Sequence, residues 1–220
     1  MSQTHDPTYA FDDDLPLEPI PAGTNLLVAG STLDGARDLA MRLLGCAESE
    51  GLLLLSTDLR GVDAIENFEA GGCRYDTSRM AVVDCLQDST DDGARNIHAV
   101  TAPSDLTGIG IAFSSLYEDL YSAGIERVRT GLCTLDPLLM YTENVQPLYR
   151  FLHTVTGRIR TANGLGVSVI DPEAQEETTV RTLSQPFDAQ VELRARDDGQ
   201  TQLRVRGLDD QPDSWQDVDL

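Results

Sequence analysis

Short apolar runs alternate with amphipathic stretches along most of this chain, and this alternation constrains the fold more than any other feature. Runs typical of strands buried on both faces lie at residues 25–29, 52–56, 80–84, 97–100, 128–133 and 167–170. Between them, apolar residues recur at the spacing of one helix face at residues 33–47, 62–70 and 145–159, and along a longer stretch for which Ser104 is the predicted N-cap. Strands that alternate with helices predict an α/β fold with a mainly parallel central sheet flanked by helices.

The last third of the chain has a different pattern. Residues 190–196 and 201–207 alternate apolar and polar side chains around the turn residues 197–200, which predicts a C-terminal β-hairpin. The side chains expected to face inward are Val191, Leu193, Ala195, Leu203 and Val205. The side chains expected to face outward are Arg194, Arg196, Arg204 and Arg206.

Length and local composition suggest one domain with two short flanks. A chain of 220 residues with 40% hydrophobic content can bury a core of single-domain size. Residues 1–22 are acidic and proline-rich, so we expect a flexible N-terminal segment. The domain should span residues 23–208, and residues 209–220 should form a loose acidic tail in which Trp215 is a candidate for docking.

The charge of the chain is strongly one-sided. It contains 37 Asp and Glu residues, 16 basic residues that are all arginine, and no lysine, for a formal net charge of -21. Acidic surfaces repel phosphate, which argues against binding to nucleic acid or to an anionic membrane. The composition also resembles that of proteins from extreme halophiles, where molar salt shortens the Debye length to about 3 Å. In that setting the net charge of the chain reflects the salinity of the habitat more than the kind of binding partner.

No stretch of the sequence approaches the roughly 18 apolar residues of a membrane span, and no apolar N-terminal run has a basic flank. We therefore expect a cytoplasmic protein. The four cysteines form no C-x-x-C pair and lack histidines at metal-ligand spacing, so the sequence predicts neither a metal site nor a disulfide framework.

A degenerate phosphate-binding loop follows the first predicted strand. Gly30 and Gly35 have the spacing of the motif G-x-x-x-x-G-K-[ST], in which backbone amides, a lysine and a hydroxyl hold phosphate and magnesium. Here Ala36 stands at the lysine position and Arg37 at the hydroxyl position, while Asp34 adds negative charge. We favour a structural turn inherited from a nucleotide-binding ancestor. The alternative is phosphate held by the amides, with Arg37 as a substitute cation.

Several segments together resemble the KaiC-like group of RecA-fold ATPases, and more closely a divergent set of uncharacterised KaiC-like proteins from halophilic archaea, some labelled transducer-like. The resemblance covers about residues 20–215 and implies a RecA-like P-loop NTPase fold. The segments that carry it are residues 23–30, 103–110, 151–158 and 203–207.

The resemblance also indicates which catalytic groups are missing. The family has a magnesium-binding aspartate at the place of Cys133, whereas Asp136 comes three residues later. Of the family's acidic pair after the second strand, only Asp58 lies nearby, and an aspartate there is more often a helix cap or a surface residue. Without the lysine, the hydroxyl and this aspartate, a γ-phosphate is neither positioned nor neutralised. We therefore expect no catalytic residue and no cofactor, with ATP and magnesium belonging only to the alternative.

One element of the family pattern is retained. KaiC-like proteins carry a basic-x-Arg pair that reaches the nucleotide of a neighbouring subunit, and Arg204 and Arg206 match it. The competing interpretation is that these arginines form ion pairs with Glu192 and surface carboxylates.

The sequence thus suggests a catalytically inactive RecA/KaiC-like protein that regulates or scaffolds through protein contacts, in signalling or in a larger assembly. Its partner would be a second copy of itself or a KaiC-like relative. One alternative is a weak nucleotide binder or slow NTPase that uses Arg37. Another is a DNA-binding recombinase paralogue, which the acidic surface disfavours.

Overall fold

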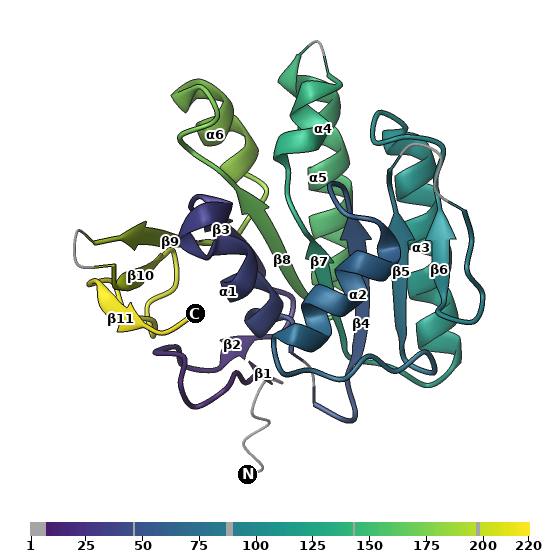
Figure 1. Ribbon diagram of the computed structural model, residues 1–220, viewed down its shortest axis with the longest axis horizontal. Coiled ribbons are helices and arrows are strands. Elements are labelled where there is room, and N and C mark those ends of the chain that lie inside the picture. Colours follow the sequence, from purple (N-terminus) through teal and green to yellow (C-terminus); the bar gives the residue numbers. More distant parts are fainter. Residues whose placement is uncertain (1–7, 46, 87–89, 143, 197–198) are drawn as a thin grey trace.

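The computed structural model describes residues 8–45, 47–86, 90–142, 144–196 and 199–220. Figure 1 shows a central twisted sheet with helices on both faces. The strands are β1 (Thr8–Tyr9), β2 (Ile20–Pro21), β3 (Asn25–Ala29), β4 (Gly51–Ser56), β5 (Met80–Asp84), β6 (Ile97–Ala99), β7 (Val128–Leu132), β8 (Leu165–Ile170), β9 (Ala189–Ala195), β10 (Thr201–Arg206) and β11 (Gln216–Val218). The helices are the 3₁₀ turn η1 (Thr32–Asp34), α1 (Ala36–Leu43), α2 (Gly61–Ala70), α3 (Leu106–Ser122), α4 (Asp136–Met140), α5 (Val145–Thr161) and α6 (Glu177–Ser184).

The main sheet has the strand order β11-β10-β9-β3-β8-β7-β4-β5-β6. The strands from β9 to β6 pair in parallel, whereas β10 runs antiparallel to both β9 and β11. The prediction of a mainly parallel sheet with helices on both faces and a C-terminal antiparallel hairpin is confirmed.

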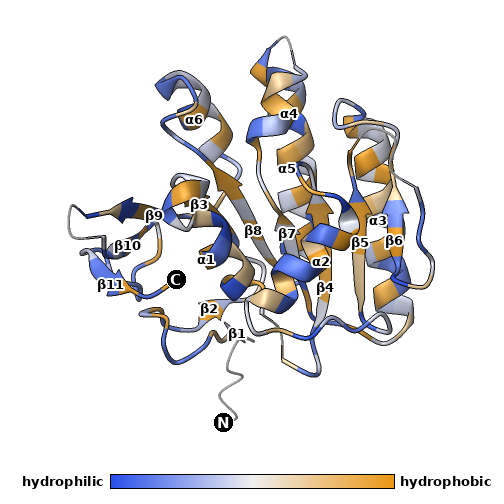
Figure 2. Ribbon diagram, viewed as in Figure 1, coloured by the Kyte–Doolittle hydropathy of each residue, from blue (hydrophilic) through white to orange (hydrophobic). Residues whose placement is uncertain are grey.

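Hydrophobic side chains fill both faces of the sheet, and Figure 2 shows the central strands in orange. Strand β4 illustrates why its sequence reads as a continuous apolar run. Leu52 and Leu54 belong to the core that α1 and α2 cover, whereas Leu53 and Leu55 belong to the core under α3 and α5. Because successive side chains of a strand point to opposite faces, a strand covered on both sides needs apolar residues throughout.

The N-terminal segment packs more closely than its composition predicts. The described part, from Thr8 onward, forms the two-stranded sheet β1-β2, and its Tyr9, Leu15 and Ile20 are buried. These apolar residues are spaced widely among aspartates and prolines, so an average over the segment conceals them. The first seven residues of the predicted flexible segment lie outside the described residues.

The acidic tail is also part of the fold. Strand β11 extends the sheet by pairing with β10, and Val218 and Gln211 are buried. Gln211 holds the N-terminal segment, since its side-chain amide donates to the carbonyl oxygen of Glu18 at 2.9 Å and its carbonyl accepts from the Glu18 amide at 3.2 Å.

Two local expectations were wrong. The N-cap of α3 is Asp105 rather than Ser104, because the Asp105 carboxylate accepts from the amide of Gly108 at 2.8 Å. Ala195 is exposed rather than inward-facing, because the tip of the hairpin extends beyond the helices that cover the sheet (Figure 1). The arginines of the hairpin do face outward, and the turn residues 197–198 lie outside the described part of the chain.

The helix expected from residue 33 begins later. Leu33 is 95% exposed and belongs to the 3₁₀ turn, and α1 starts at Ala36. Gly35 separates the two elements with a φ of 93°, a left-handed conformation that glycine adopts without steric cost. No helix within the described ranges is long and apolar enough to cross a membrane.

Candidate functional site

The loop between β3 and α1 lies at the carboxyl edge of the parallel strands, where open α/β sheets bind their ligands. Three of its amides, however, are occupied within the loop. The Leu33 amide donates to the hydroxyl of Ser31 at 3.2 Å. The amides of Asp34 and Ala36 donate to the Ser31 carbonyl at 3.0 and 3.2 Å. Ser31 thus takes three donors of the kind that a phosphate-binding loop directs at its ligand.

The two glycines of the loop each have a packing role. A Cβ at Gly30 would lie 2.8 Å from the Cβ of Leu193 in β9, so only glycine fits between the strands there. A Cβ at Gly35 would lie 2.8 Å from a methyl group of Leu220, in addition to the strain of its positive φ. Both glycines are therefore needed for the turn and its packing, irrespective of any ligand.

Arg37, the second residue of α1, forms an ion pair with Asp58, which follows β4. The two side chains are 24% and 18% exposed. Burial raises the pKa of Asp58 above its ordinary value, and the Arg37 guanidinium opposes that rise only in part. Among the described residues, Arg37 Nε and Asp58 Oδ1 have no hydrogen-bond partner. The two charged groups therefore point toward each other.

Cys133, at the place of the family's magnesium aspartate, follows β7 and is 2% exposed. Burial, together with a smaller effect of the nearby Asp58 carboxylate, raises the pKa of its thiol to about 12. The thiol is therefore neutral near pH 7 and is not a magnesium ligand, because magnesium requires oxygen ligands.

Asp136, three residues later, accepts hydrogen bonds from three donors. They are the Thr134 hydroxyl at 2.8 Å, the Gln175 amide at 2.9 Å and the Asp171 backbone amide at 3.2 Å. These bonds anchor the start of α4 to the segment after β8. Within the described part of the chain, no group of three or more His, Cys, Asp or Glu side chains is arranged to hold a metal ion.

The structure therefore brings Arg37, Asp58, Cys133 and Asp136 to one edge of the sheet. The Asp136 and Asp58 carboxylates are close enough for Asp136 to contribute to the raised pKa of Asp58. The residues do not fit a magnesium–nucleotide complex. A guanidinium and a neutral thiol stand where a hydroxyl and a carboxylate are needed, and three of the loop amides already donate to Ser31.

Arg204 and Arg206 lie elsewhere, on β10, and both bind the same carboxylate. Arg204 Nε lies 2.6 Å from Glu192 Oε2, and Arg206 Nε lies 2.9 Å from Glu192 Oε1. Glu192 sits directly opposite Arg204 in the β9–β10 register. Trp215 stacks on two guanidinium groups, with the carbon atoms of Arg194 and Arg204 at 4.1 and 4.4 Å from its ring centre.

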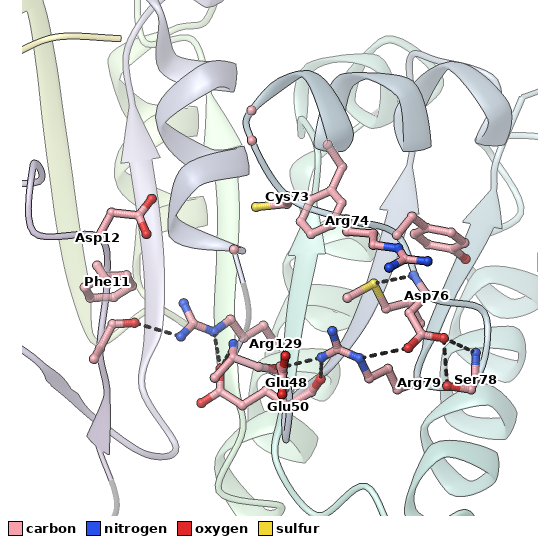
Figure 3. A pocket seen from close by; sticks show the side chains of 18 of the residues that line it. Phe11, Asp12, Glu48, Glu50, Cys73, Arg74, Asp76, Ser78, Arg79 and Arg129 are labelled. Atoms are coloured by element: carbon pink, nitrogen blue, oxygen red, sulfur yellow. Dashed lines mark hydrogen bonds and ion pairs between the residues drawn. The ribbon is translucent and has the colours of Figure 1, made fainter.

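An open cleft of about 1270 Å³ lies at the opposite, amino edge of the strands, between the N-terminal segment and the connection from α2 to β5 (Figure 3). Its charged groups largely satisfy one another. Arg79 donates to the carbonyl oxygens of Ala47 and Glu50 at 2.7 and 2.6 Å and also pairs with Asp76. Because these groups bind the chain itself, they position loops more than they offer a ligand site.

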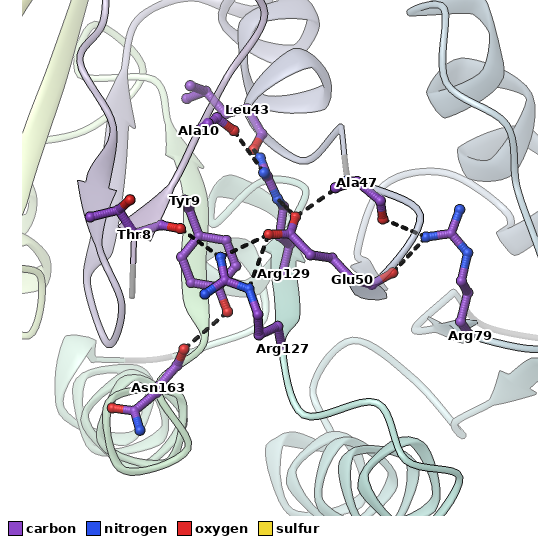
Figure 4. A network of polar contacts seen from close by, with 10 residues as sticks. All are labelled: Thr8, Tyr9, Ala10, Leu43, Ala47, Glu50, Arg79, Arg127, Arg129 and Asn163. Carbon is purple, nitrogen blue, oxygen red and sulfur yellow. Dashed lines mark hydrogen bonds and ion pairs between the residues drawn. The ribbon is translucent and has the colours of Figure 1, made fainter. Parts of the chain in front are cut away.

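A buried carboxylate organises this amino edge (Figure 4). Glu50 binds Arg127 at 2.9 Å and Arg129 at 2.8 Å. The same arginines donate to the carbonyl oxygens of Thr8 and Ala10 at 2.6 and 2.7 Å, which fastens the N-terminal segment. Sequence reasoning missed this network. The sequence feature that could have revealed it is Arg129 inside an apolar strand, because a charge in a strand buried on both faces requires a buried partner.

Comparisons with known proteins agree with the fold and leave the function open. The model of one family, described as a family of unknown function (DUF7504), matches residues 23–193. A comparison with curated protein sequences finds no match. The chain is similar to the crystal structure of the KaiC-like protein PH0186 from the hyperthermophilic archaeon Pyrococcus horikoshii OT3. The TM-score is 0.65 at 14% sequence identity, over 96% of this chain and 94% of that one, so the likeness concerns the fold.

Proposed function

The chain belongs to this family of unknown function (DUF7504), and we propose that it is a KaiC-like RecA-fold protein that regulates or organises a partner without hydrolysing ATP. The observation that carries this proposal is the ion pair between Arg37 and Asp58. It places a guanidinium at the position of the hydroxyl that binds magnesium in an active loop, and a cation there repels the metal.

The surrounding residues support the same proposal. Three amides of the loop donate to Ser31 instead of to a phosphate, and the neutral Cys133 thiol supplies no charge to a metal shell. Phosphoryl transfer depends almost entirely on positioning and charge neutralisation, so the loss of both removes most of its rate enhancement. The degenerate loop is thus better explained as a structural remnant than as a working site.

Action through protein contacts is supported by the exposed apolar side chains on the carboxyl edge of the sheet. Leu33 on the loop and Met140 at the end of α4 are 95% and 83% exposed, and Tyr141 follows at 58%. Adjacent exposed apolar side chains are typical of interaction sites, and Met140 and Tyr141 are neighbours in the chain. The acidic, lysine-free composition supports a setting of high salt, in which apolar contacts persist while exposed ion pairs are screened.

The test measures ATP turnover and the binding of a fluorescent ATP analogue by the full chain in molar KCl with magnesium. We expect no turnover above background and no saturable binding. The variant Arg37→Ala should behave in the same way, and Arg150→Ala, an exposed arginine on α5, is the matched control. Turnover that Arg37→Ala abolishes and Arg150→Ala retains would refute the proposal in favour of a slow NTPase that uses Arg37.

A further inference from the structure

The tail from residue 209 to residue 220 covers a basic surface of the hairpin. Strand β11 occupies the outer edge of β10, with Leu203 opposite Gln216 and Thr201 opposite Val218. Farther along the same edge, the amide of Val205 donates to the carbonyl oxygen of Pro212 at 2.8 Å. The tail thus satisfies a strand edge that would otherwise present unpaired backbone groups.

The side chains of the tail complement the surface beneath them. Trp215 lies against the guanidinium groups of Arg194 and Arg204. Two residues later, the Asp217 carboxylate accepts from the Gln202 side chain at 2.7 Å. An aromatic ring followed by a carboxylate therefore fits this arginine-lined edge, because the ring attracts cations and the carboxylate accepts hydrogen bonds.

The same tail reaches the loop at the carboxyl edge. The carbonyl oxygen of Asp219 accepts from Arg42 of α1 at 2.6 Å, and Leu220 packs against Gly35. Figure 1 shows the end of the chain beside α1. Release of the tail would therefore uncover both the arginines of the hairpin and the flank of the degenerate loop.

Apart from Gln211, which is buried and hydrogen-bonded to Glu18, the tail is held by few contacts for the surface it covers. Only three residues form β11, and Val218 is the one fully buried apolar side chain among residues 213–220. Leu220 is 41% exposed, and Asp213, Asp217 and Asp219 face solvent. A short edge strand held by one apolar side chain and by polar contacts can be exchanged for a competing strand without unfolding the sheet behind it.

We propose that residues 209–220 are a displaceable cover, and that the surface beneath them, the β10 edge with Arg194 and Arg204, docks an extended segment of a partner protein with an aromatic residue followed by carboxylates. The cover itself shows the chemistry that fits: an antiparallel strand, a ring between two guanidinium groups and a carboxylate on Gln202. This docking site rests on the proposal that the chain works through protein contacts.

The test uses the full chain opened by Val218→Asp and a fluorescein-labelled peptide with the sequence of residues 209–220. We expect saturable binding, seen by anisotropy, at least about tenfold tighter for the opened chain than for the wild type, in which the tethered tail competes at an effective concentration near millimolar. Trp215→Ala opens the cover without placing a charge in the core and replaces the Val218 variant if that one fails to fold. With the Trp215→Ala chain, the tryptophan of the peptide is the only one in the mixture, so its intrinsic fluorescence reports docking directly.

Two controls test the chemistry of the contact. A peptide with serine in place of Trp215 should bind the opened chain at least fivefold more weakly, and Arg194→Gln in that chain should weaken the original peptide similarly. Equal binding by opened and wild-type chains, or no saturable binding to a folded opened chain, would overturn the docking site. Self-association of the wild type that Val218→Asp abolishes would also overturn it, by showing that the tail is exchanged between copies. None of these measurements uses nucleotide, so a negative result for the docking site does not bear on the proposal that the chain does not hydrolyse ATP.

Discussion

The change Glu50→Gln should destabilise the fold far more than the equivalent change at Glu192. Each glutamate bridges two arginines, but the Glu50 side chain is 5% exposed whereas that of Glu192 is 21% exposed. Glutamine keeps the shape and removes the charge, which leaves Arg129, at 3% exposure, as a buried cation without a counter-ion. Breaking a buried pair in this way costs about 3–5 kcal/mol.

The expected shift in melting temperature follows from the size of the chain. A loss of 1 kcal/mol lowers the Tm of a domain of this length by about 2–4 °C, so Glu50→Gln should lower it by about 6–20 °C. Glu192→Gln breaks a partly solvated pair and should cost about 0–1 kcal/mol, or at most about 4 °C. Calorimetry and urea unfolding of both variants at the same salt concentration measure the difference.

A second readout separates the network from general destabilisation. Since Arg127 and Arg129 hold the carbonyl oxygens of Thr8 and Ala10, Glu50→Gln should speed hydrogen exchange in residues 8–22 before it does so in β3. Equal melting temperatures for the two variants, or a cost of less than about 1 kcal/mol at Glu50, would refute the reasoning that burial sets the value of these ion pairs.

Three further predictions concern the burial of individual side chains. Because burial raises the pKa of Asp58, the folded chain binds a proton on this carboxylate more tightly than the unfolded chain does. The stability of the wild type relative to Asp58→Asn should therefore increase as the pH falls from 7 toward 4 and decrease as the pH rises. The same pH dependence of stability in both chains would contradict this. Ala36→Lys should destabilise the chain by about 3 kcal/mol or more, because Ala36 is fully buried and the new ammonium group would lack a partner. The variant should not bind an ATP analogue. A stable variant that does bind the analogue would show that the loop can open. Burial raises the thiol pKa of Cys85 and Cys133 more than that of the half-buried Cys73. Of these three described cysteines, peptide-resolved alkylation at pH 8 should therefore modify Cys73 before Cys85 and Cys133, and the reverse order would contradict the burial.

The sheet could be predicted from the sequence because its signal is local. Each central strand, such as residues 52–56, is apolar on both faces, and periodicity reports that directly. The hairpin could be predicted for the same reason, since the alternation around residues 197–200 extends over both strands. The packing of Tyr9 and Val218 could not, because isolated apolar residues in acidic segments carry no periodic signal.

Three residues that the sequence singled out, Arg37, Asp58 and Cys133, lie at one edge of the sheet, but how they pair depends on the order of the strands. Strands β3 and β4 are separated by β8 and β7, so neither sequence distance nor strand adjacency relates Arg37 to Asp58. Helix α1 packs over β8, and from its first turn the Arg37 side chain reaches Asp58, which follows β4. Sequence reasoning could identify both charges but not their encounter.

Three arginines of this chain share a feature that bears on any ligand of theirs. Arg37, Arg129 and Arg204 each face a carboxylate of the same chain, namely Asp58, Glu50 and Glu192. An incoming phosphate must therefore displace a carboxylate already in place, and its own attraction is weakened when the salt concentration is high. Stacking of an aromatic ring on a guanidinium, as at Trp215, leaves the carboxylate of Glu192 on Arg204 undisturbed. In an acidic chain without lysine, recognition by aromatic rings and strand edges is consequently more accessible than recognition of phosphate.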